Sequence, residues 1–119
     1  MAKKVLIIGD TIIDKSVYLE AIGLSLESPT IKTSFLKEKI NFGGAANVAR
    51  YASYFGLDVT FATCMSEESE KSFPDTIELI NLDNTIENTK TRFYVNHGDE
   101  NYKYLQINNT NKNKIGSNF

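Results

Sequence analysis

The sequence has few of the residues that build the commonest catalytic and metal sites. Its 119 residues include one histidine, His97, and one cysteine, Cys64. This scarcity excludes a cysteine–histidine metal cluster, and the one histidine falls in an expected turn, so no Ser-His-Asp triad can be proposed. A single cysteine also excludes a disulfide framework. Because Cys64 ends an apolar run, we expect it to be a buried thiol.

Other signals are missing as well. No apolar run is long enough for a membrane-spanning helix, and the run after the first lysines is too short for a signal peptide. The net charge of −2 at pH 7 argues against a dedicated nucleic-acid or anionic-membrane binder. The phosphate-binding patterns Gly-x-x-x-x-Gly-Lys-Ser/Thr and Gly-x-Gly-x-x-Gly do not occur. We therefore expect a cytoplasmic protein with no nucleic-acid and no membrane partner.

The residues that are present predict an α/β fold. The length allows one domain, and a hydrophobic content of 41% suits a globular chain. Val5–Ile8 and Leu57–Cys64 are continuous apolar runs, as in strands buried on both faces. Between them, Ala45–Phe55 has an alanine-rich helical pattern that Gly56 ends. This order predicts a right-handed, parallel βαβ unit. The helix residues expected to pack inward are Ala45, Ala46, Val48, Ala49, Ala52 and Phe55.

Segments with a different pattern surround this unit. Ser16–Ile22 and Ile31–Ile40 mix apolar and polar residues, which predicts two exposed strands inserted after the first core strand. Another strand is expected at Ile77–Leu82. Thr91–Val95 and Tyr102–Ile107 predict a hairpin.

Within this hairpin, Gly98 would supply the positive φ of the turn. We expect Tyr94 to pair across the hairpin with Tyr102 and Tyr104. The tail, residues 109–119, is rich in asparagine and lysine and is expected to be loose.

Two carboxylates follow the first predicted strand. Asp10 and Asp14 fall in the segment Gly9–Asp14, which we expect to be a loop beyond the carboxyl end of the strand. Such loops bind ligands in α/β proteins, and a carboxylate can accept hydrogen bonds from two adjacent sugar hydroxyls. From its position alone, a structural role of Asp14 as a loop or capping aspartate is favoured over ligand binding.

Glycines and cations form two further candidate features. Gly43 and Gly44 open the predicted helix, and Asn47 follows one turn later with an amide that can donate to and accept from a hydroxyl. A tight turn against a neighbouring strand would use the same glycines. Lys90 and Arg92 could meet an anionic ligand, although the segment by itself favours a solvated strand.

The combination of these features resembles a known family. Ile7–Asp14 followed by Gly43–Ala49 is similar to the N-terminal signature of the ribokinase-like (PfkB-type) carbohydrate kinases. Within that family the resemblance is strongest to the kinases of D-glycero-D-manno-heptose 7-phosphate, the kinase half of bifunctional ADP-heptose synthases. Ser25–Pro29 resembles their lid segment, and Thr89–Arg92 resembles their Thr-Lys-Thr-Arg strand. Leu105–Asn108 resembles the strand that follows.

The resemblance implies the N-terminal portion of a Rossmann-type sheet with a small β-sheet lid over a sugar. Residues 1–108 would form a truncated ribokinase-like domain, with core elements at about 4–14 and 41–82 and lid strands at about 16–40 and 90–108. In the family, the aspartate matching Asp14 binds sugar hydroxyls, and the residues matching Gly43, Gly44 and Asn47 shape the sugar site. The expected substrate-binding residues are Asp10, Asp14, Gly43, Gly44, Asn47, Lys90 and Arg92, with no catalytic residue and no metal ligand.

The resemblance also implies ATP and Mg²⁺ as cofactors, but their binding sites are not in this sequence. The family's Gly-Ala-Gly-Asp segment, which supplies the catalytic base, is absent. We therefore expect the sugar-binding and lid portion of a heptose-phosphate-type kinase that is inactive alone, its partner being a sugar or sugar phosphate. Two alternatives stay open. One is a binding module that dimerises through lid strands or joins a separate C-terminal half, and the other is a small α/β protein without a sugar role.

Overall fold

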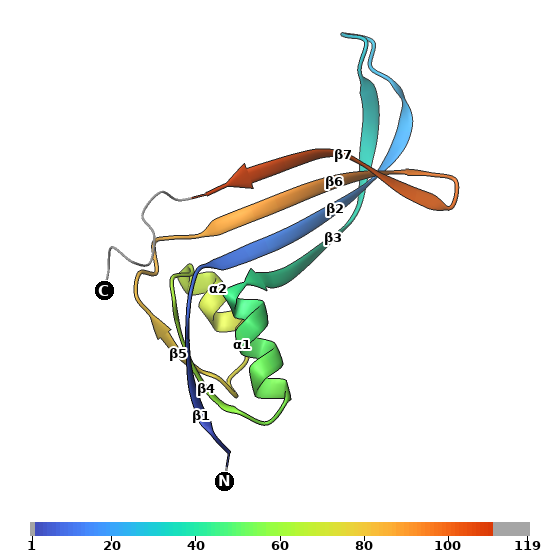
Figure 1. Cartoon of the computed structure of the whole chain (residues 1–119). Coiled ribbons are helices and arrows are strands. Elements are labelled where there is room, and N and C mark those ends of the chain that lie inside the picture. Colours follow the sequence, from blue (N-terminus) through green and yellow to red (C-terminus); the bar gives the residue numbers. More distant parts are fainter. Residues whose placement is uncertain (1, 111–119) are drawn as a thin grey trace. The chain divides into compact units, whose positions relative to one another are not determined.

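A computed structural model describes residues 2–110 of the chain (Figure 1). In chain order the elements are β1 (Lys4–Ile8), β2 (Thr11–Leu24), β3 (Ile31–Gly44), α1 (Ala45–Tyr54), β4 (Asp58–Thr63), α2 (Glu67–Ser72), β5 (Glu78–Asn81), β6 (Asn88–His97) and β7 (Glu100–Asn109). Each expected strand and helix is therefore present, several with longer bounds than the sequence predicted. In the described part of the chain, no helix is both long and apolar enough to cross a membrane.

The chain divides into two compact units. The first unit holds β1, α1, β4, α2 and β5, and the second, made of Asp14–Asn41 and Lys90–Asn108, holds most of β2, β3, β6 and β7. Of the expected loose tail, residues 111–119 lie outside the described residues, and Asn109 ends β7. The division of residues 1–108 into core elements and lid strands, with the bounds given above, stays a prediction.

The first unit contains a three-stranded parallel sheet in the order β1-β4-β5. In its register, Ile7 lies opposite Phe61, and Phe61 lies opposite Leu79. The parallel pairing of β1 with β4 across α1 confirms the predicted βαβ unit, since parallel strands need a crossover connection.

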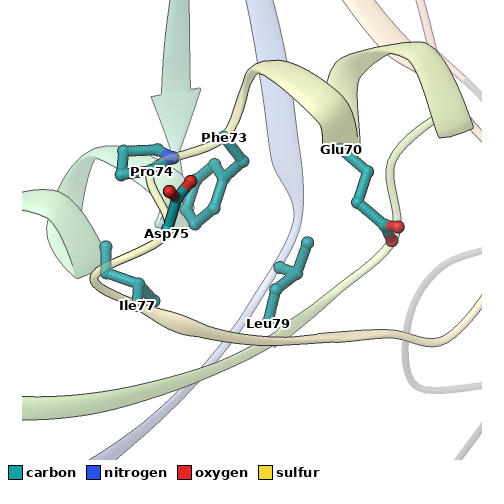
Figure 2. Close-up of a pocket in the computed structure, with 6 residues that line it drawn as sticks. All are labelled: Glu70, Phe73, Pro74, Asp75, Ile77 and Leu79. Carbon is teal, nitrogen blue, oxygen red and sulfur yellow. The ribbon is translucent and has the colours of Figure 1, made fainter.

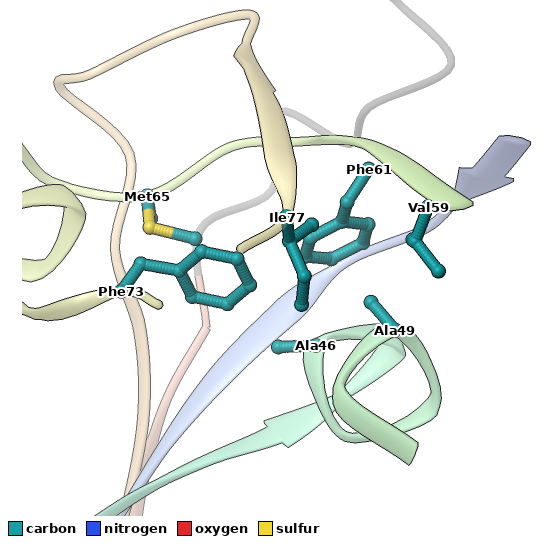
Figure 3. Close-up of a cluster of buried hydrophobic side chains, with 7 residues drawn as sticks. All are labelled: Ala46, Ala49, Val59, Phe61, Met65, Phe73 and Ile77. Atoms are coloured by element: carbon teal, nitrogen blue, oxygen red, sulfur yellow. The ribbon is translucent and has the colours of Figure 1, made fainter. Parts of the chain in front are cut away.

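Small residues on α1 let the helix pack closely on this sheet. Ala46 and Ala49 are fully buried, and Figure 3 shows both methyl groups directed from α1 toward the side chains of β4. Phe61 lies at the centre of the cluster with no exposed surface, and its ring lies 5.8 Å from that of Phe73. Phe73 also meets Phe42 edge to face at 5.2 Å. The remaining members of the cluster are Val59, Met65 and Ile77.

The sequence predicted that the two apolar strands, β1 and β4, are each buried on both faces. This prediction is correct for β4 and wrong for β1. Phe61, Ala62 and Cys64 in and after β4 are buried, which confirms the buried thiol. In β1, however, Leu6 is 60% exposed and Ile8 is 50% exposed. The reason is geometric: β1 is an edge strand, and alternate side chains point to opposite faces, so only one set meets α1.

The inward face of α1 is narrower than predicted. Ala46, Ala49 and their partly buried neighbours pack inward, but Val48 and Phe55 are 57% and 77% exposed. A sheet covers one stripe of a helix, and the small alanines already fill that stripe. Gly56 follows the helix with a φ of 91°, as expected for a residue that ends it.

The second unit is a four-stranded sheet in the order β3-β2-β6-β7. Gly98, with a φ of 64°, lies in the turn between β6 and β7, which confirms the predicted hairpin. The expected pairing of Tyr94 with Tyr102 and Tyr104 is wrong. Phe93 approaches Tyr104 instead, at 6.4 Å between ring centroids, because successive residues of a strand face opposite sides.

Candidate functional site

The structure assigns the predicted substrate-binding residues to both units. Asp10, Gly43, Gly44 and Asn47 belong to the first unit. Asp14, Lys90 and Arg92 belong to the second. We describe each group by itself.

Gly44 is held against the main chain of Asp10. Its φ of 63° and ψ of −137° fall where side-chain-bearing residues are strained. A Cβ atom added there would lie 2.7 Å from the Asp10 carbonyl oxygen. That oxygen accepts a hydrogen bond from the Ala45 N–H at 2.9 Å, at the start of α1. Close approach to the chain's own backbone therefore explains Gly44, and Gly43 beside it is buried.

Gly9 also lies close to the start of α1. A Cβ atom on Gly9 would lie 2.6 Å from the Cβ of Ala45. Glycines on both segments thus fix the Gly9–Asp10 connection against the first residue of α1. The side chains of Asp10 and Asn47 are exposed, and no side chain caps the helix. A carboxylate and an amide near this helix start are consequently available to hydroxyl groups of a ligand.

Asp14 does not lie in a loop, which corrects the prediction for Gly9–Asp14. Only Gly9 and Asp10 form the connection, because β2 already begins at Thr11. The Asp14 carboxylate accepts a hydrogen bond from Arg92 on β6 at 3.4 Å between Oδ1 and Nη1. Both side chains are about one-third exposed. An ion pair with this exposure contributes little stability, about 0.2–1 kcal/mol.

This ion pair has a chemical consequence for the carboxylate. Arg92 contacts Oδ1 of Asp14, and each carboxylate oxygen can accept more than one hydrogen bond. The contact restricts the rotamer of Asp14. Lys90 is half-buried, and among the described residues no carboxylate pairs with it.

A group of aromatic and basic side chains in the second unit was not predicted from the sequence. Tyr18 on β2 stacks on Tyr94 of β6, with ring centroids 5.2 Å apart and ring planes within 15°. The ammonium groups of Lys37 and Lys39 on β3 lie 5.1 and 5.9 Å from the centre of the Tyr18 ring. The i, i+2 spacing of the two lysines was a usable signal, since it puts both on one face of a strand.

A polar network in the first unit was also missed. Asn81, at the end of β5, accepts from the Met65 N–H and donates to the Met65 carbonyl and to Glu70. Glu87 accepts hydrogen bonds from the hydroxyls of Ser66 and Ser69, and the Ser66 hydroxyl caps α2. These bonds anchor α2 and the segment after β5, which is a structural role.

A hollow opens beside this network (Figure 2). It has a volume of about 270 Å³ and is lined by Glu70, Phe73, Pro74, Asp75, Ile77 and Leu79. None of the predicted substrate-binding residues lines it. Among the described residues, no group of three or more histidine, cysteine, aspartate or glutamate side chains could hold a metal ion. The hollow therefore offers acidic and apolar groups but no cation-binding cluster. Elsewhere in the first unit, hydrogen bonds from Thr85 lower the pKa of the partly exposed Asp83.

Solved structures with the same architecture decide the fold. A carbohydrate kinase from Agrobacterium tumefaciens superposes with a TM-score of 0.61 and 17% identity, covering 90% of this chain and 35% of that one. Arabidopsis thaliana ribokinase, solved with ribose and ATP, gives a TM-score of 0.58 at 15% identity, covering 91% of this chain and 36% of that one. The chain has a ribokinase-like fold. Escherichia coli phosphofructokinase-2 with fructose-6-phosphate gives a TM-score of 0.57 at 16% identity, covering 98% of this chain and 39% of that one.

Comparisons of sequence agree with the ribokinase-like fold over a shorter stretch. No family model matches the chain. The bifunctional protein HldE of Rhodopseudomonas palustris (strain BisB5) is 36% identical over 64 residues, which is 54% of this chain and 13% of that protein. HldE of Campylobacter jejuni (strain RM1221) is 33% identical over 70 residues, covering 59% and 15%. The chain thus matches a small fraction of these relatives, and the predicted resemblance to PfkB-type kinases is confirmed.

Proposed function

We propose that this chain is the sugar-binding and lid portion of an ATP-dependent carbohydrate kinase. The observation that carries the proposal is the Asp14 carboxylate, held by Arg92 and one-third exposed, in a chain with a ribokinase-like fold. The two oxygens of an ionised carboxylate each accept hydrogen bonds and donate none. They can therefore bind two adjacent hydroxyls of a sugar.

Each predicted residue has a proposed part in this binding. In the second unit Asp14 accepts from sugar hydroxyls, Arg92 orients Asp14, and Lys90 supplies a positive charge to a sugar phosphate. In the first unit the Asp10 carboxylate and the Asn47 amide bind hydroxyls. Gly43 and Gly44 keep the backbone at the start of α1 free of side chains.

The finer specificity is proposed from the partial matches to HldE. These matches and the Thr89–Arg92 segment support a heptose phosphate as the sugar. Transfer of a phosphoryl group needs a base for the attacking hydroxyl and donors around the transferring phosphate. The sequence contains no Gly-Ala-Gly-Asp segment, and the described residues form no metal cluster. The residues present do not fit ATP with Mg²⁺, so we propose that the 119 residues alone bind sugar without phosphorylating it.

Substitution of Asp14 tests the proposal. Asp14→Asn keeps the size of the side chain but removes its charge, so we expect about 10- to 100-fold weaker binding of sugar phosphates, because charge-assisted hydrogen bonds are lost. Isothermal titration calorimetry on both proteins measures the change. Asp99→Asn, an exposed aspartate in the β6–β7 turn, is the matched control and should bind like the wild type. Equal affinities for Asp14→Asn and wild type would contradict the proposal.

A second candidate function is a binding module that pairs through the strands of the second unit. β3 and β7 are the edges of the four-stranded sheet, and Phe35, Tyr102 and Tyr104 are more than half exposed. Unprotected edge strands and exposed aromatic side chains favour pairing with another chain. A related phosphofructokinase-2 from Escherichia coli is described as a tetrameric inhibited form.

Light scattering distinguishes this candidate. We expect a dimer whose fraction rises with protein concentration. We expect the substitution Tyr104→Glu to lower the dimer fraction, because it places a charge among exposed aromatic residues. Lys71→Glu, on the exposed face of α2, serves as the control for an added acidic group. A wild-type protein that remains monomeric at millimolar concentration would eliminate the second candidate.

A further inference from the structure

The hollow in the first unit combines an apolar floor with an acidic rim (Figure 2). Phe73 and Ile77 are 6% and 4% exposed and Leu79 is partly buried, so these side chains form the floor. The carboxylates of Glu70 and Asp75 are exposed, and in Figure 2 they lie on either side of Leu79. A ligand that matches both parts has an apolar body and a positive charge.

The sequence builds this floor by ending α2 early. Pro74 lacks an N–H and favours an extended backbone in the residue before it, and Phe73 has φ −76° and ψ 143°. The chain therefore leaves the helix, and the ring of Phe73 turns inward, with its centroid 5.2 Å from that of Phe42 and 5.8 Å from that of Phe61. Because these contacts fix the ring, little further order is imposed on the floor when a ligand covers it.

The Glu70 carboxylate is positioned by the protein itself. Its Oε1 accepts a hydrogen bond from the Asn81 side-chain amide at 2.9 Å, and that amide is also bonded to the backbone of Met65. Among the described residues, no lysine or arginine lies within ion-pair distance of Glu70 or Asp75. A carboxylate can accept several hydrogen bonds, so Glu70 can also accept one from an ammonium group.

The charge around the hollow favours a cation over an anion. The segment from Glu67 to Glu78 contains one basic residue, Lys71, and is otherwise acidic in its charged residues. These acidic residues are Glu67, Glu68, Glu70, Asp75 and Glu78. Their field attracts cations and repels phosphates and carboxylates. A metal ion does not fit, because the described residues provide no group of three acidic, histidine or cysteine ligands. An organic cation is the charge that fits.

The arrangement of floor and rim decides which organic cation fits. The carboxylates are exposed and the apolar side chains are more deeply buried, so the apolar end of a ligand enters first and its charge stays at the rim. A lysine or arginine side chain of another protein would insert its charge first, and an apolar floor disfavours that charge. The volume of about 270 Å³ lies just below the range of about 300–1,000 Å³ that is usual for drug-sized ligands. A small free amine therefore fits better than a protein side chain.

We propose that this hollow is a binding site for a small primary amine. The Glu70 carboxylate holds the ammonium group, and the apolar body of the amine covers Phe73, Ile77 and Leu79. Asp75 adds negative charge at the rim. None of the proposed sugar-binding residues lines the hollow, so the amine site goes beyond the proposed function and is independent of it.

The test compares an amine with its uncharged counterpart on the full chain. Phenethylamine and 2-phenylethanol are titrated into the ¹⁵N-labelled protein, and the backbone amides of Phe73, Ile77 and Leu79 report binding by nuclear magnetic resonance. We expect phenethylamine to bind with a Kd of about 1 mM and 2-phenylethanol about tenfold more weakly, because only the amine makes a charge-assisted hydrogen bond. Glu70→Gln keeps the acceptor for Asn81 but removes the charge. It should lose about tenfold in affinity for the amine and keep its affinity for the alcohol.

A matched control and the alcohol keep the test decisive. Glu68→Gln should retain the wild-type affinities, because Glu68 is exposed on the same helix but does not line the hollow. Unchanged binding of the alcohol by Glu70→Gln shows that this variant is folded. The proposal is overturned by the absence of saturable shifts at about 20 mM phenethylamine, by equal binding of amine and alcohol, or by equal affinities of Glu70→Gln and wild type for the amine. Tighter binding of Nα-acetyl-lysine amide than of phenethylamine at the same amides would also overturn it, because the hollow would then suit a partner's side chain.

Discussion

Gly44→Ala is expected to lower the free energy of unfolding by about 3 kcal/mol, which is a large share of the stability of a small domain. The loss has two sources. The backbone of Gly44, with φ 63° and ψ −137°, strains any residue with a side chain, and the added methyl group would lie 2.7 Å from the Asp10 carbonyl oxygen. A backbone atom cannot rotate away as a flexible side chain can. The β3–α1 junction or the Gly9–Asp10 connection would therefore have to move.

Urea denaturation followed by circular dichroism measures this effect. Gly56→Ala is the matched control because Gly56 lies in the same unit with a φ of 91°, yet a Cβ there would meet no atom within 4 Å. We expect Gly56→Ala to cost only the backbone strain, about 1–2 kcal/mol. If both variants lose the same stability, the contact with Asp10 does not restrict this position.

Phe61→Ala is expected to lower the free energy of unfolding by about 3–5 kcal/mol. Phe61 has no exposed surface and contacts the ring of Phe73 at the centre of the cluster in Figure 3. Removing the ring leaves a cavity between α1 and the parallel sheet, because the alanines of α1 are too small to fill it.

Phe55→Ala is the control for this substitution. Phe55 directly follows α1 and is 77% exposed, so its truncation should change stability by no more than about 0.5 kcal/mol. The two phenylalanines belong to the same unit and can be compared by the same denaturation experiment. A comparable loss in both variants would mean that Phe55 is buried, as the helical pattern alone suggested.

Much of the fold follows from local sequence features. Val5–Ile8 and Leu57–Cys64 predicted strands because each is a continuous apolar run, and Gly98 predicted the hairpin because it supplies a positive φ. These signals lie within a few residues of the structure they specify. The errors arose where burial depends on neighbours. Leu6 and Phe55 are apolar, but no local pattern says which of their sides is covered.

The candidate site was less predictable for a related reason. Asp14 was singled out by its position after the first strand, but its ion pair joins residues far apart in the chain. The stack of Tyr18 on Tyr94 likewise depends on the register between β2 and β6. Neither contact follows from periodicity within one strand. The role of Gly44 was left open between a ligand and a neighbouring strand, and the structure shows the second type of contact, with the Asp10 backbone.

Binding of sugar at Asp14 is the central claim, and it is tested most directly by nuclear magnetic resonance. The ¹⁵N-labelled chain is titrated with mannose 6-phosphate, and each backbone amide reports its own change in chemical shift. We predict saturable shifts at the amides around Asp14 and Arg92 in wild type, and in Asp14→Asn the same shifts only at about 10- to 100-fold higher ligand concentration. Shifts confined to the hollow lined by Phe73 and Leu79, or shifts that persist unchanged in Asp14→Asn, would contradict the claim.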